Sequence, residues 1–163
     1  MRVAQQSVGL CMLCKKARGQ SDRLWLAQMQ GAKPRLRQQH CVHALLSAAH
    51  PTLAAAFHAF PAALWALSAS WLSSLFVTVL PLPLCAQVAC AAVVHGPGVL
   101  SACVVAVLAS HEAVVVERCL GGDLDAWSAG LVLYDWDSAG LLAAALALHA
   151  QHRRMLLDTL LPP

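Results

Sequence analysis

Charged residues are scarce in this chain of 163 residues, and the middle of the sequence has none. Asp, Glu, Lys and Arg together make up 12% of the residues, against about 25% in an average domain. From Gln38 to His111 not one of the four occurs. A charge-free run of this length is expected in a membrane segment, in the interior of a helical domain, or in a truncated piece of a larger domain.

Aromatic residues are also few, at 6% of the chain, and only Trp25 precedes Phe57. Surfaces for single-stranded nucleic acid combine basic side chains with aromatic rings, so we expect no nucleic-acid partner. The distribution of charge predicts a poorly structured basic leader over residues 1–37 and a helical region over residues 38–163. From residue 15 onward, the basic residues of the leader are Lys15, Lys16, Arg18, Arg23, Lys33, Arg35 and Arg37.

The seven cysteines form no pattern typical of a disulfide framework, and without a secretory signal we expect reduced thiols. Cys11 and Cys14 have the C-x2-C spacing of half a zinc site, which Cys41 and His43 could complete. The second pair is closer together than in a usual zinc knuckle, and no glycine forms a turn between the first two. We therefore interpret these residues as packing residues and predict no metal or other cofactor.

The eight histidines raise the question of a small hydrolase or metal enzyme, but none lies in H-E-x-x-H or beside a nucleophile motif. Asp135 and Asp137 are two residues apart and would point in different directions on a helix, so they predict no acid–base or Mg²⁺ pair. Asp137 or Ser138 is better placed as a helix N-cap. The histidines are His40, His43, His50, His58, His95, His111, His149 and His152.

Proline and glycine divide the rest of the sequence into segments of helical length, rich in Ala and Leu. The fold class that follows is all-α, a bundle of about six to seven short helices. The predicted helices are Arg23–Gln30, Leu36–Ala49, Pro51–Phe60, Ala62–Leu80, Leu84–Val94, Val99–Arg118, Asp125–Tyr134 and Ser138–His149.

The segment 62–80 is the one long enough to cross a bilayer as a single helix. Its apolar residues fall on one side at helical spacing, opposite a face of hydroxyl groups, and this pattern favours a helix packed on a protein core. The alternative is a small membrane protein with one or two transmembrane helices, 62–80 and 84–108, and its basic residues on the cytoplasmic or matrix side. The apolar stripe is Leu64, Leu67, Trp71, Leu72, Leu75, Phe76 and Val79, and the hydroxyl face is Ser70, Ser73, Ser74 and Thr78.

Several sequence features between Leu45 and Glu112 follow one another in an order and at a spacing typical of a known domain family. They begin with LLSAAHPTLAAAFHAF from Leu45 to Phe60, two helical stretches joined at a proline. They continue with six single positions, Trp71, Leu75, Phe76, Pro81, Gly96 and Glu112. In this order they resemble the C-terminal half of the TBC domain, the all-helical catalytic domain of Rab-GTPase-activating proteins. The resemblance covers about Leu45 to Val116 and continues more loosely to Leu148.

The departures from the family pattern concern its signature and its catalytic residues. Where the family has R-x-W-D, this sequence has Gln87, Val88, Ala89 and Cys90, and His95 replaces the acid before Gly96. The family's catalysis resembles a scheme with an Arg from I-x-x-D-x-x-R and a Gln from Y-x-Q. The first motif does not occur here, Val3-Ala4-Gln5 matches the second without its tyrosine, and Arg18 and Arg23 lack the motif's framing. No catalytic residue is assigned.

The resemblance implies a catalytically inactive fragment or pseudo-domain, a binding or scaffold module linked to small-GTPase regulation. Its expected partner is a Rab-type small GTPase, and its expected location is the cytoplasm, peripheral to endomembranes and in possible contact with them. Half of a domain core would expose apolar surface, so we also expect self-association. An in-frame I-x-x-D-x-x-R upstream of Met1 would instead make the chain a partial view of an active enzyme.

Overall fold

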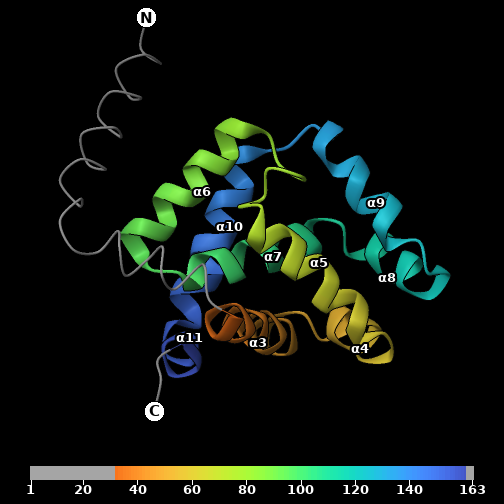
Figure 1. Ribbon diagram of the computed structural model, residues 1–163, viewed down its shortest axis with the longest axis horizontal. Coiled ribbons are helices and arrows are strands. Elements are labelled where there is room, and N and C mark those ends of the chain that lie inside the picture. The colour runs from red at the N-terminus through yellow and green to blue at the C-terminus, as the bar shows by residue number, and fades with distance from the viewer. Residues whose placement is uncertain (1–31, 161–163) are drawn as a thin grey trace, which may run out of the picture.

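The structure is a computed structural model that describes residues 32–160 (Figure 1). Within this range the chain forms nine α-helices and one 3₁₀ helix and contains no strand, which confirms the all-α class. The predicted helix Arg23–Gln30 and residues Cys11 and Cys14 lie outside the described residues. The helices are α3 (Ala32–Ala49), α4 (Pro51–Ala59), α5 (Pro61–Ser73), α6 (Leu82–His95), α7 (Gly98–Ser110), α8 (Glu112–Gly121), α9 (Leu124–Gly130), the 3₁₀ helix η1 (Leu131–Leu133), α10 (Ser138–Gln151) and α11 (Arg153–Leu160).

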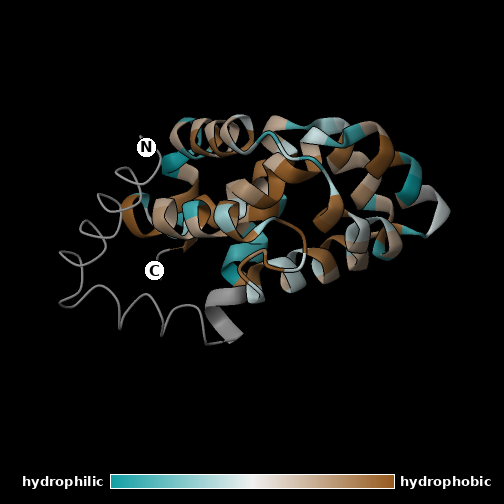
Figure 2. Cartoon of the chain, turned by 90° about the horizontal axis from the view of Figure 1, so that it is seen from above, coloured by the Kyte–Doolittle hydropathy of each residue, from teal (hydrophilic) through white to brown (hydrophobic). Residues whose placement is uncertain are grey.

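Helix α7 forms the centre of the fold. Every residue from Gly98 to Leu108 is buried, and the helices α3, α5, α6 and α10 pack around it (Figure 1). Hydrophobic residues prevail on most helices of the bundle (Figure 2). A helix enclosed in this way cannot carry a charged side chain without the large cost of desolvating it. The central part of the charge-free run is therefore explained by burial within the bundle.

Prolines open three of the helices. Pro51, Pro61 and Pro83 each lie in the first turn of α4, α5 and α6, where the missing N–H has no helical partner to lose. The predicted helices Pro51–Phe60 and Leu84–Val94 are thus present, the second one beginning earlier because Pro83 belongs to its first turn. The helix α3 likewise begins at Ala32, within the segment expected as leader.

The prediction of a helix over 62–80 is wrong in its second half, because α5 ends at Ser73. Leu75 and Phe76 adopt positive φ angles of 49° and 65°, which an α-helix cannot contain. The turn keeps its backbone groups paired, since Phe76 N donates to Trp71 O at 2.8 Å. The turn also buries the Phe76 ring. That burial stabilises the fold by about 2 kcal/mol and so offsets the backbone strain.

The predicted helix Val99–Arg118 is broken at His111, where α7 and α8 meet at an angle of 86°. The break has a physical reason. The bend packs α8 against α4 and α9. Val115 and Cys119 of α8 are buried there, while Glu117 and Arg118 remain exposed.

A helix that the sequence did not predict, α11, closes the bundle against α3. Its polar start at Arg153 and Arg154 suggested the end of the preceding helix, but Leu156 is buried in the core cluster. The predicted Asp125–Tyr134 is present as α9 followed by η1, and Ser138–His149 as α10.

Among the described residues, no helix by itself has both the length and the apolar character to cross a bilayer. Two consecutive pairs satisfy the criterion jointly, but α4 and α5 are bent by 110° and α7 and α8 by 86°. The two spans of the membrane alternative are accordingly not continuous helices in this structure: 62–80 is interrupted after Ser73, and 84–108 at Gly96.

Candidate functional site

The six positions of the family motif take structural roles in different parts of the fold. Trp71 and Phe76 are each 1% exposed, and the Trp71 indole Nε1 donates a hydrogen bond of 3.0 Å to Ser128 Oγ on α9. The half-buried Leu75 lies with Phe76 in the turn after α5. These residues join α5, its following turn and α9 into one packed unit.

The other three positions lie at helix ends. Pro81 is the N-cap of α6, and Gly96 ends the same helix at φ 103° and ψ 165°. Glu112 opens α8, with one carboxylate oxygen 3.8 Å from His50 Nδ1. The structure does not gather the six positions into one surface, so they form no catalytic or binding constellation by themselves.

A different group of residues does come together, around His111 at the α7–α8 break. The His111 ring lies 4.6 Å from Tyr134, 5.2 Å from Trp136 and 5.7 Å from Trp127, measured between ring centroids, and each pair is edge-on. Tyr134 and Trp136 are themselves 5.3 Å apart. Edge-to-face contacts of this kind add about 0.5–1.5 kcal/mol each beyond the burial of area, so the cluster fixes the loop after η1 onto α7.

The hydrogen bonds of His111 indicate its tautomer. Ser110 Oγ donates to Val107 O at 2.9 Å, which leaves His111 Nδ1 to donate to Ser110 Oγ at 3.0 Å and to Val107 O at 3.3 Å. The proton is then on Nδ1. His111 Nε2 is buried and has no hydrogen-bond partner within the described part of the chain.

The rings of His111, Tyr134 and Trp136 form one wall of a pocket of about 450 Å³, which we call the His111 pocket. Its floor is apolar and comes from Ala106 and Ala109 of α7 and from Leu141 of α10. A volume of this size suits a small molecule or a protruding side chain of a partner.

Asp135 and Asp137 both line the His111 pocket. They lie in the non-helical segment between η1 and α10, so the expectation that they would point apart on a helix does not apply. Asp137 is the N-cap of α10, as predicted, and its Oδ1 accepts a bond of 3.0 Å from Gly140 N. In the sequence, YDWD was considered only for its two aspartates. Nothing in it showed that His111, far away in the chain, would be its neighbour.

The cysteines of the described chain are buried or half-buried, and the thiols of the four buried ones are hard to ionise. Burial raises the pKa of Cys41 to about 11, against a smaller opposing effect of a hydrogen bond with Thr159. Burial, with a minor contribution from Cys85, raises the pKa of Cys103 to about 12. Burial also raises the pKa of Cys85 and Cys119. Such thiols pack as small apolar groups and are poor nucleophiles at neutral pH.

Two residues of the possible zinc pattern, Cys41 and His43, lie on α3. Burial, and then the charge of His40, lower the pKa of His43. Within residues 32–160 no three His, Cys, Asp or Glu side chains are grouped so that they could hold a metal ion. Cys11 and Cys14 belong to the part of the chain outside this description.

In comparisons with known proteins, the chain matches no family model, and no curated protein or solved structure shows significant similarity to it.

Proposed function

We propose that this chain is a helical binding module without catalytic activity, linked to the regulation of Rab-type small GTPases. The resemblance of Trp71, Phe76 and Pro81 to the TBC pattern supports the link, and their packing and turn-forming roles are those of a scaffold. The finger motifs of the family do not occur in the sequence, so stimulation of GTP hydrolysis is not part of the proposal. The expected place of action is the cytoplasm, at the periphery of endomembranes.

The observation that carries the binding role is the exposed apolar turn beside the His111 pocket. In η1 and just after it, Val132, Leu133 and Tyr134 are exposed, and the Leu133 side chain is 88% accessible. Anchored aromatic rings next to protruding aliphatic side chains are typical of the centre of protein interfaces. We call these three residues and the His111 pocket the partner surface.

A direct test mixes the purified chain with a panel of GTP-loaded Rab proteins and measures both binding and hydrolysis. Binding to at least one of them is expected, with a loss of about tenfold in affinity for Leu133→Asp, since a truncated hot spot costs about 1.4 kcal/mol or more. Leu82→Asp is the matched control, because Leu82 is also exposed, at 68%, but lies on α6.

Two outcomes would contradict the proposal in different ways. Stimulation of GTP hydrolysis by more than tenfold would show that the chain is catalytic. Equal loss of binding in Leu133→Asp and Leu82→Asp would show that the partner surface is not where a GTPase docks.

The alternative, a small membrane protein, remains a proposal of its own. It is favoured by the two bent apolar helix pairs and by exposed apolar residues on α6, Leu82 and Val94. Alkaline carbonate extraction separates the two: a chain that remains in the membrane pellet supports the membrane alternative, and one that is released supports the binding module. The exposed residues on α6 are also the surface through which we expect self-association.

A further inference from the structure

A second, smaller pocket lies at the turn between α6 and α7. It has a volume of about 150 Å³, and we call it the turn pocket. Arg37 of α3 and His149 of α10 line it together with His95 and Gly98 of the turn itself, and leucines of α11 complete its wall. Five helices, α3, α6, α7, α10 and α11, therefore meet at this place.

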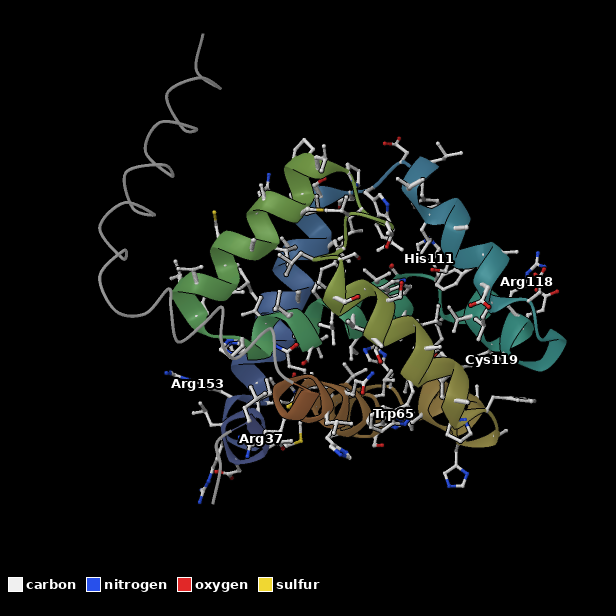
Figure 3. All side chains as sticks on the ribbon, in the orientation of Figure 1. Arg37, Trp65, His111, Arg118, Cys119 and Arg153 are labelled. Atoms are coloured by element: carbon white, nitrogen blue, oxygen red, sulfur yellow. The ribbon has the colours of Figure 1, made fainter. Side chains whose placement is uncertain are left out.

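The polar side chains that line the turn pocket include three bases and no acid. Arg37 Nη1 donates a bond of 3.2 Å to Leu160 O, which holds the guanidinium at the end of α11. The rings of His95 and His149 are 6.4 Å apart. Arg37 and Arg153 lie at the same end of the molecule (Figure 3). Burial, and then the charges of His95 and Arg153, lower the pKa of His149. Arg37 therefore brings a positive charge to the site, and no acidic side chain in the lining offsets it.

His149 is a polar group of the wall that a ligand in the turn pocket could reach. Its side chain is only 9% exposed, yet it has no hydrogen bond to any other described residue. Neither nitrogen of the His149 ring is fully enclosed, so each is open to a hydrogen-bond partner from outside the chain. Since the imidazole lines the turn pocket, a group bound in the pocket would supply one.

The start of α7 adds a second source of positive potential. This helix of 13 residues has no side-chain cap and no acidic residue in its first turn. The N-terminus of a helix carries a partial positive charge and favours anions. A Cβ atom on Gly98 would lie 3.3 Å from His149 Cδ2 and 3.5 Å from His149 Nε2, so the helix start and the imidazole are in close contact. Glycine at this position leaves the space for that approach.

We propose that the turn pocket binds the phosphate group of a phosphomonoester. Arg37 would donate to its oxygens, His149 and His95 would each donate one N–H, and the start of α7 would add its partial charge. The volume suits a single tetrahedral oxyanion and is too small for a nucleotide. The leucines of α11 then lie where the organic part of the ester would leave the pocket. This site is separate from the partner surface and does not depend on the proposed function.

In the first test, inorganic phosphate is titrated into the whole chain at constant ionic strength and mildly acidic pH. Binding is monitored through the amide chemical shifts of the chain. Saturable shifts are expected at Gly98 and His149, with a dissociation constant that rises about tenfold or more in Arg37→Gln. Arg118→Gln is the matched control. It removes the same charge from Arg118 of α8, which forms an exposed ion pair with Asp123 and lies away from the turn pocket (Figure 3).

A second variant, His95→Gln, separates a loss of binding from a folding defect. His95 is exposed at the end of α6, so its replacement leaves the core unchanged. This variant is expected to weaken phosphate binding while its thermal denaturation stays that of the unmodified chain. Shifts that do not saturate, or equal affinities in Arg37→Gln and Arg118→Gln, would overturn the proposal.

The source of the phosphate is distinguished in a second pair of measurements. Vesicles containing phosphatidate and soluble glycerol phosphate are each titrated against the chain and against Arg37→Gln. Binding that depends on Arg37 in the first assay identifies a lipid headgroup, and in the second a soluble metabolite. If neither assay shows binding that depends on Arg37, the proposal of a phosphomonoester site is contradicted.

Discussion

Replacing Gly96 with alanine isolates the backbone conformation of the turn between α6 and α7. Gly96 has φ 103° and ψ 165°, a region that residues with a Cβ atom rarely adopt. A Cβ added there would meet no atom within 4 Å, so no steric clash contributes. The expected loss in the free energy of unfolding is therefore the backbone strain alone, about 1–3 kcal/mol.

Gly130→Ala is the matched control for Gly96→Ala. Gly130 also has no neighbour within 4 Å of an added Cβ, but its φ of −75° and ψ of −19° are helical. Alanine there is expected to be neutral or to stabilise the chain by up to about 1 kcal/mol. The two variants add the same methyl group to open space, so the difference between them measures conformation only.

Urea denaturation followed by far-UV circular dichroism gives the comparison, with equal slopes required for all three proteins. A midpoint clearly lower for Gly96→Ala than for the unmodified chain, and not for Gly130→Ala, is the expected result. If Gly96→Ala unfolds within about 0.5 kcal/mol of the unmodified chain, the turn does not hold the positive φ on which the reasoning depends.

Three further predictions concern single side chains. Trp71→Phe and Ser128→Ala each remove the hydrogen bond between the two residues and are expected to destabilise the chain by about 1–4 kcal/mol. Their effects in the double variant should not add, and additive shifts in thermal denaturation would show that the bond contributes nothing. Burial lowers the pKa of His149 below its ordinary value of 6.5. As the pH falls, the imidazole of His149 is therefore protonated in the unfolded chain before it is protonated in the folded one. Stability should therefore fall as pH decreases through that value, and His149→Gln should reduce the slope of the urea midpoint against pH. Cys103, with a pKa of about 12, should react with a thiol reagent only after unfolding; peptide mass mapping of the native chain that finds it modified rapidly would contradict its burial.

Local signals in the sequence were enough for the helical character of the chain and for many of its helix starts. Pro51 and Pro61 each marked the beginning of a helix, because the effect of proline on the backbone depends on its own position alone. Asp137 was recognised as an N-cap for the same reason, since a cap bonds within its own turn. The apolar stripe that includes Trp71 and Phe76 correctly marked buried residues.

Helix ends that depend on packing were not predictable in this way. Leu75 and Phe76 are not glycines and carry no sign of a positive φ. They adopt it because the turn places the Phe76 ring in the core, and that gain depends on distant residues. The break at His111 and the existence of α11 have the same origin, in the contacts of α8 with α4 and of α11 with α3.

Both candidate sites depend on residues that are far apart in the chain. His111 meets Tyr134 and Trp136 only after α9 and η1 have folded back along α8, and Arg37 meets His149 only after α11 has packed on α3. The charge-free run, the prolines and the periodic apolar residues were sufficient for an all-helical chain with a buried centre, because burial and helix formation follow from composition and short-range order. Which side chains share a pocket was decided by the packing of the helices, because long-range contacts place residues together without leaving a local pattern in the sequence.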